Sequence, residues 1–309
     1  MKKKGALEIS FAWIFAVVIG AIILFIAIFA SVKLIGIGET QMGAKAGKEI
    51  GILLNPLETG FESAKSVSFT MPVLSRIYGR CDNEGNFGRQ LIEVSQQSFN
   101  KWTQTDLEVQ FPNKYIFNEE YVEGKKFYVF SKPFNFPFKV ADLIFLTSSE
   151  KEYCFVNAPE EIQREIKGIS QKNMLVENCS LNSIKICFES DTGCLISVDY
   201  NGKSVQKSSE KVYFEDDALM YAAIFSDKEI YECQVQRLMK RVNELSKLYQ
   251  DKISVISRSG CNSNLGPELD ALSSLAKGVQ SSANLGFALI STVKTIEEDN
   301  SYASECKLW

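Results

Sequence analysis

The longest stretch of the chain without a charged residue runs from Ile9 to Val32, a span of 24 residues. As an α-helix it would be about 36 Å long, which exceeds the roughly 30 Å of hydrocarbon in a bilayer. No polar face interrupts the run, so such a helix needs an apolar neighbour on every side. The pattern predicts one transmembrane helix over residues 9–32.

A cleaved secretory signal is the alternative interpretation of this run. The apolar region of such a signal has only about 7–15 residues and is followed by a cleavage site with small residues. Ala27, Ala30 and Ser31 resemble such a site. The run is longer than a signal requires, which favours the membrane anchor.

The charges that flank the run predict its orientation. Lys2, Lys3 and Lys4 precede it, and only Lys33 follows closely. By the positive-inside rule, residues 1–8 form a basic cytoplasmic tail and the bulk of the chain is extracellular. We therefore expect a single-pass protein of the cell membrane, in contact with the lipid bilayer, with a cytoplasmic N-terminus.

Residues 33–69 are expected to form a juxtamembrane stalk. Leu53, Leu57, Phe61 and Ala64 recur on one face of a helix, and Pro56 interrupts the pattern. The spacing predicts a stalk that is helical in parts and bent near the proline.

Residues 70–215 are expected to form a β-rich external domain, because short aromatic and β-branched runs alternate with Gly, Pro, Asn and Asp. The clearest signal is Asn201-Gly202, which predicts a type I′ hairpin turn between two strands. The phenylalanines between Phe127 and Phe138 are expected in the core, with an exposed adhesive patch as the alternative. The expected strands are Leu107–Phe111, Lys126–Ser131, Phe138–Thr147, Tyr153–Val156, Ile184–Phe188, Leu195–Tyr200, Lys203–Lys207 and Lys211–Phe214.

The period changes to a helical one in residues 216–309. Asp216 and Asp217 are expected to begin a helix through capping and the helix dipole. Two heptad runs follow, Tyr231–Tyr249 and Leu269–Val293, separated by a loop with Gly and Pro. They predict an antiparallel helical hairpin that packs on the sheet; an intermolecular coiled coil is the alternative. Together these patterns predict an α+β fold.

The first residues resemble the class III signal of archaeal type IV pilin-like proteins. The match consists of Lys2-Lys3-Lys4-Gly5-Ala6-Leu7-Glu8 followed by a continuous apolar helix, and it covers about the first 35 residues. The resemblance implies cleavage between Gly5 and Ala6, packing of the helix into a filament core, and an outward-facing head.

The same resemblance assigns an assembly role to Glu8, which would meet the amino terminus of a neighbouring subunit. The glutamate of that family usually lies five residues into the mature chain, whereas Glu8 would be the third. The alternative is a carboxylate at the cytoplasmic headgroup boundary, where its burial costs little.

All eight cysteines follow the apolar run, in a compartment where disulfides persist. Their number is even and no Cys-x-x-Cys occurs, so we expect disulfides, with buried thiols as the alternative. At least one local bridge is expected among the cysteines from 179 to 194, and Cys306 is expected to tie down the C-terminal tail. The candidates are Cys81, Cys154, Cys179, Cys187, Cys194, Cys233, Cys261 and Cys306. Asn178-Cys179-Ser180 is a glycosylation sequon that only the external side would use.

Composition gives little support for catalysis. The chain has 309 residues, no histidine, and 34 basic against 38 acidic residues. The absence of histidine removes His-based triads and ligands, and the net charge of −4 argues against nucleic-acid binding. Phosphate-loop, dinucleotide and hydrolase motifs are missing too, so we expect no enzyme activity, cofactor or metal.

Two functions compete at this stage. The first is a non-catalytic structural or assembly protein of the cell envelope, similar to a pilin or minor pilin, with protein partners or self-assembly through the N-terminal helix. The alternative is a monomeric, signal-anchored extracellular module that binds a glycan, a peptide or a surface partner. Cleavage after Gly5 distinguishes them.

Overall fold

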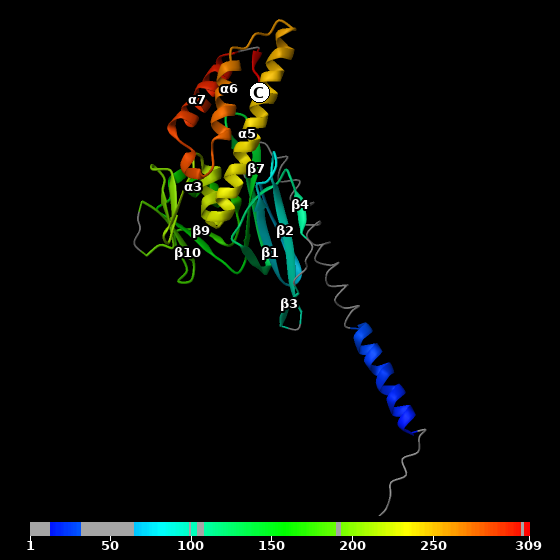
Figure 1. The fold of residues 1–309 in the computed structure, drawn as a ribbon. Coiled ribbons are helices and arrows are strands. Elements are labelled where there is room, and N and C mark those ends of the chain that lie inside the picture. The colour runs from blue at the N-terminus through cyan, green and yellow to red at the C-terminus, as the bar shows by residue number, and fades with distance from the viewer. Residues whose placement is uncertain (1–12, 32–64, 99, 104–107, 190–192, 304–305) are drawn as a thin grey trace, which may run out of the picture.

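The computed structural model describes residues 13–31, 65–98, 100–103, 108–189, 193–303 and 306–309. It confirms an α+β fold with an apolar N-terminal helix, two β-sheets and a group of C-terminal helices (Figure 1). The predicted cytoplasmic tail and most of the predicted stalk lie outside the described residues. The end of the stalk does not: a strand already begins at Lys65.

The first sheet has the strand order β3-β2-β1-β6-β7-β5, and β4 also pairs with β2. Its strands are β1 (Lys65–Asp82), β2 (Arg89–Ser98), β3 (Lys101–Thr103), β4 (Val109–Phe111), β5 (Tyr115–Phe117), β6 (Tyr121–Asn135) and β7 (Lys139–Ser148). The strands predicted around residues 107–111, 126–131 and 138–147 correspond to β4, β6 and β7. The sequence patterns missed β1, β2, β3 and β5.

This sheet curls until its two ends meet. β4 pairs with β2 at one end, whereas β5, which follows β4 after residues 112–114, pairs in parallel with β7 at the other. The Ile116 backbone N–H of β5 donates to Gln90 Oε1 of β2 at 3.1 Å. A Cβ on Gly79 would lie 2.1 Å from Asn118 Oδ1, so a larger residue here would displace the Asn118 side chain.

The curled sheet encloses a small core of its own. Ile77, Ile92, Phe127 and Ile144 are among the buried residues of its concave side, whereas Phe130 and Phe145 of the convex side belong to a larger core. The phenylalanines between Phe127 and Phe138 are buried, as expected. Along β6 and β7, successive side chains therefore point in turn into the small core and into the larger core.

The second sheet has the order β13-β12-β11-β10-β8-β9. Its strands are β8 (Tyr153–Val156), β9 (Met174–Val176), β10 (Ile184–Phe188), β11 (Ile196–Asp199), β12 (Ser204–Lys207) and β13 (Glu210–Tyr213). Apart from β9, they match the strands predicted from the sequence. Helix α3 (Glu160–Ile169) was not predicted, although Ile162, Ile166 and Ile169 form its buried face.

The β11–β12 hairpin is confirmed, but its two-residue type I′ turn is wrong. Asp199 pairs with Ser204, which leaves four residues in the loop, and the positive φ of 52° belongs to Lys203. The Gly202 backbone N–H donates to Asp199 Oδ1 at 2.7 Å. This aspartate side chain stabilises a longer turn than the Asn-Gly pair alone predicts.

Helix α4 (Asp217–Phe225) lies between the two sheets. Asp216 caps it, as predicted, by accepting the Leu219 backbone N–H at 2.8 Å. Every residue from Ala218 to Phe225 is buried, and the helix contacts β6 and β7 of one sheet and β12 and β13 of the other. The sheets and the C-terminal helices therefore share one core.

The first heptad run forms α5 (Lys228–Ser257), whose seam is buried within the protein itself. The second run is not one helix. It divides into α6 (Gly266–Lys277), the 3₁₀ turn η1 (Ser282–Asn284) and α7 (Phe287–Tyr302), because Gly278 and Gly286 end and restart it. Figure 1 shows α6, α7 and the end of α5 grouped beyond one end of the sheets, whereas the start of α5 lies beside the strands.

Candidate functional site

The N-terminal helix is described from Trp13 to Ser31 and is exposed along its whole length. Its mean hydropathy is 3.0, and no residue of it is buried. Phe25, for example, is 70% exposed. A helix of this length and composition is a signal sequence or a membrane anchor, so the protein is secreted or anchored on the outside of a membrane.

The residues that the pilin resemblance singles out are Gly5, Ala6 and Glu8. All three lie outside the described residues, as do Lys2–Lys4. Their roles stay predictions.

Four disulfides cross-link the part of the chain from residue 65 to residue 309, which we call the head. Their pairs are Cys81–Cys233, Cys154–Cys179, Cys187–Cys194 and Cys261–Cys306. They confirm the expected disulfides, the local bridge and the tie on the C-terminal tail. Because such bonds persist in oxidising compartments, they agree with an extracellular head. The sequon residue Asn178 is exposed, but Cys179 beside it is bridged.

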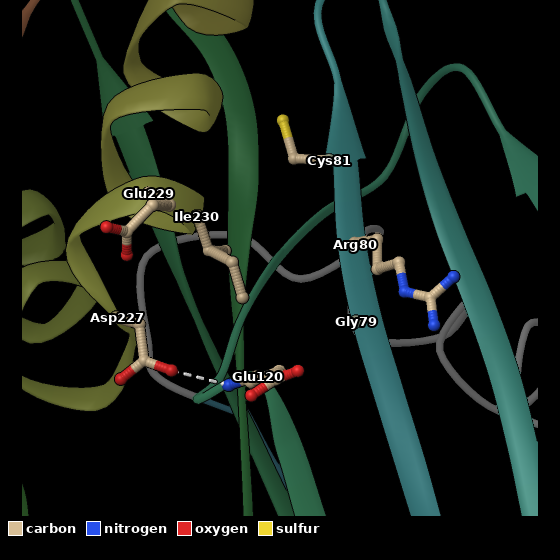
Figure 2. A pocket seen from close by; sticks show the side chains of 7 residues that line it. All are labelled: Gly79, Arg80, Cys81, Glu120, Asp227, Glu229 and Ile230. Atoms are coloured by element: carbon tan, nitrogen blue, oxygen red, sulfur yellow. Dashed lines mark hydrogen bonds between the residues drawn. The ribbon is translucent and has the colours of Figure 1, made fainter.

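A pocket of about 500 Å³ opens where α5 begins beside β1 (Figure 2). Asp227, Glu229 and Ile230 contribute from the start of α5, and Asp227 Oδ2 accepts the Glu120 backbone N–H at 2.6 Å. Arg80 turns its guanidinium away from these carboxylates, and it pairs with Glu93 at 3.2 Å and Glu108 at 2.7 Å. The lining also includes Gly79, Cys81 and Glu120.

A second pocket, of about 540 Å³, adjoins the first and shares Glu120 and Asp227 with it. It adds more acidic groups, and its cation Lys151 already pairs with Glu119. The full lining is Leu74, Glu119, Glu120, Tyr121, Glu123, Glu150, Lys151 and Asp227. Such a lining attracts cations and hydrogen-bond donors. In the first pocket, Cys81 is bonded to Cys233 and therefore offers no free thiol as a nucleophile.

A cluster of titratable groups joins the two sheets at the start of α4. Lys132 Nζ of β6 donates to both carboxylate oxygens of Glu165 in α3, at 2.6 and 2.7 Å. The Tyr221 hydroxyl donates to Glu165 Oε2 at 3.1 Å, and the Tyr200 hydroxyl donates to Asp217 Oδ1 at 3.0 Å. Burial, with help from Asp217, raises the pKa of Tyr200 to about 12. These contacts fasten α3, α4 and β6 together.

Burial shifts two further groups. The pKa of Asp216 rises to about 7, because protein atoms crowd around its carboxylate and disfavour the charge. Burial lowers the pKa of Lys207 to about 8, while Asp227 and Glu119 oppose that shift. Lys207 Nζ donates to the Ser226 carbonyl at the end of α4, at 2.7 Å.

Among the described residues, sequence reasoning missed one fully buried cation. Arg237 of α5 is fully buried, and its guanidinium lies 4.6 Å from the centre of the Tyr115 ring. It donates to the carbonyls of Phe87, Lys114 and Pro112 and to Gln234 Oε1, at 2.7–3.1 Å. No signal in the sequence predicts this, because the carbonyls come from turns far apart in the chain.

Within the ranges that the structure describes, no group of three or more Cys, Asp or Glu residues is arranged to hold a metal ion. Comparisons with protein families, with curated proteins and with solved structures found no match. The function is therefore argued from the helix, the disulfides and the pockets.

Proposed function

We propose that this protein is a membrane-anchored structural or assembly protein of the cell envelope that resembles a pilin or minor pilin. The observation that carries the proposal is the exposed apolar helix Trp13–Ser31, joined to a disulfide-stapled head. At about 25 cal/mol per Å² of apolar surface, such a helix cannot stay in water and needs lipid or a second helix.

The proposed topology is N-terminus in, head out. Lys2, Lys3 and Lys4 support a cytoplasmic N-terminus, and the four disulfides support an external head. In this arrangement a peptidase cuts between Gly5 and Ala6, and Glu8 contributes to contacts between the helices of neighbouring subunits.

The proposed role of the protein is non-catalytic. Three titratable groups, Lys132, Glu165 and Arg237, are bound to side chains or carbonyls that hold the fold together. Their contacts support a structural role.

One observation favours the second candidate, a monomeric binding module. Two neighbouring pockets lie beside the start of α5, share Glu120 and Asp227, and carry several acidic side chains that a cationic or hydrogen-bonding partner could contact. This module keeps the anchor and the external head but has no processing at Gly5 and no filament.

Mass spectrometry of the N-terminus of protein from native membranes tests the proposal. We expect a chain that starts at Ala6, and we expect Gly5→Val to retain the full N-terminus. Gly20→Ala serves as the matched control, because a Cβ at Gly20 meets nothing within 4 Å and the variant leaves the cleavage site unchanged.

An intact Met1 or Lys2 start in wild-type protein would overturn the pilin-like assignment in favour of the binding module. Electron microscopy of surface filaments gives an independent measurement. Recovery of the full-length chain as a soluble monomer without detergent would overturn both, because the anchor is common to them.

A further inference from the structure

The first half of β1 has a strand partner on one side only. Residues Lys65–Thr70 pair with β6, but pairing with β2 begins at Ser75. From residue 66 to residue 74, the side of β1 opposite β6 therefore has no paired strand in the described part of the chain. Backbone N–H and C=O groups on such an edge are a template for another strand.

The apolar side chains of this segment are also incompletely covered. Val67, Phe69 and Met71 pack against the small core inside the curled sheet, yet all three are only partly buried. Phe69 stacks on Phe127 with ring centroids 5.2 Å apart. Further along the same strand, where β2 is present, Ile77 is 1% exposed. An added strand would cover the apolar side chains that β2 does not reach.

The edge is uncharged, and it is complementary to itself. Residues 66–75 read Ser-Val-Ser-Phe-Thr-Met-Pro-Val-Leu-Ser, without a single acidic or basic side chain. Natural proteins usually protect exposed edges with charges, lysine above all. An antiparallel pair centred on Ser68 would place Ser66 opposite Thr70 and Val67 opposite Phe69. No like charges would meet, and an aromatic side chain would face a β-branched one, which is a favourable pair.

We propose that the head forms a dimer with a second copy of this chain by antiparallel pairing of the two β1 edges around Ser68. The pairing is two-fold symmetric, so it closes at two copies and does not propagate. Anchoring both chains in one membrane raises their effective concentration. The proposal concerns the head alone and stands whether or not the N-terminal helices assemble into a filament.

The first test measures the mass of the full-length chain in detergent by sedimentation. We expect a dimer for the wild type and at least a tenfold loss of dimer for Ser68→Lys, which places two positive charges across the symmetry axis. Ser254→Lys, at an exposed position of α5, adds the same charge elsewhere and should leave the dimer intact. Thr70→Lys, also exposed, repeats the test if Ser68→Lys does not fold.

The second test is a covalent one. Directly opposite residues in an antiparallel pair have Cα atoms about 4.5–5.5 Å apart, within disulfide range. Under oxidising conditions Ser68→Cys should give a covalent dimer, and the control Ser254→Cys should not. A monomeric wild type, or cross-linking equal to that of the control, would overturn the proposal.

A dimer that persists unchanged in Ser68→Lys and Thr70→Lys would also overturn it. That result would place the dimer contact outside this edge and leave the pilin-like proposal intact. The experiments can therefore refute the proposal of N-terminal processing without refuting edge pairing, and the reverse.

Discussion

Replacing Arg237 with alanine should strongly destabilise the head. The guanidinium is fully buried and provides four hydrogen bonds, to acceptors in two separate turns of the curled sheet and in α5. Two of these acceptors, the Lys114 carbonyl and Gln234 Oε1, are in buried contacts. Left without a donor, each would cost about 1–3 kcal/mol.

The loss of packing by the arginine stem adds to this penalty. We expect the free energy of unfolding to fall by about 4 kcal/mol, because two buried acceptors lose their donor at about 1–3 kcal/mol each. Arg237→Lys should fall between the wild type and alanine, because one ammonium cannot reach carbonyls on all sides.

Urea unfolding under non-reducing conditions measures the effect. With a denaturant slope of about 3 kcal/mol per M, the midpoint should fall by about 1.3 M. Arg258→Ala, at the exposed end of α5, is the control and should change stability by less than about 0.5 kcal/mol. A loss below about 1 kcal/mol in Arg237→Ala would show that the guanidinium does not hold α5 on the sheet.

Two further predictions concern disulfides and pH. Removing Cys81–Cys233 with a double serine variant should lower the free energy of unfolding by about 5 kcal/mol, and removing Cys187–Cys194 in the same way by about 2 kcal/mol. The difference arises because the two bridges close loops with separations of 152 and 7 residues. Equal melting temperatures for the two variants would contradict this. The pKa of Asp216 is raised to about 7, so its contribution is fully present below its unfolded pKa near 4 and is lost as pH rises through 7. Asp216→Asn keeps the capping oxygen and should therefore reduce the loss of thermal stability between pH 5 and 8; an unchanged pH profile would refute the assignment.

Local patterns predicted most elements whose side chains repeat with a clear period. The heptad of α5 was found because Tyr231, Val235, Leu238 and Val242 form its buried seam. β1 was missed because its inward positions include Gly79 and Cys81, and Pro72 interrupts the alternation. A strand in a curled sheet does not need a continuous apolar face.

Contacts between distant parts of the chain could not be predicted. Eight cysteines allow 105 pairings, and the choice of Cys81–Cys233 depends on α5 packing against the end of β1. Arg237 likewise depends on turns that come together only when β4 and β5 close the sheet. Sequence patterns therefore predict the individual strands and helices, but the contacts of Arg237 and Cys81 form only when those elements pack together.

The complete enclosure of α4 limits how this protein can be divided. Eight of its nine residues touch protein on all sides, and they supply the filling between the sheets. A fragment that ended after β13 would expose the apolar faces of both sheets that α4 covers, and we expect it to aggregate. For recombinant production both sheets and α4 therefore have to stay in one fragment, and protease digestion should yield the two sheets together and neither sheet alone.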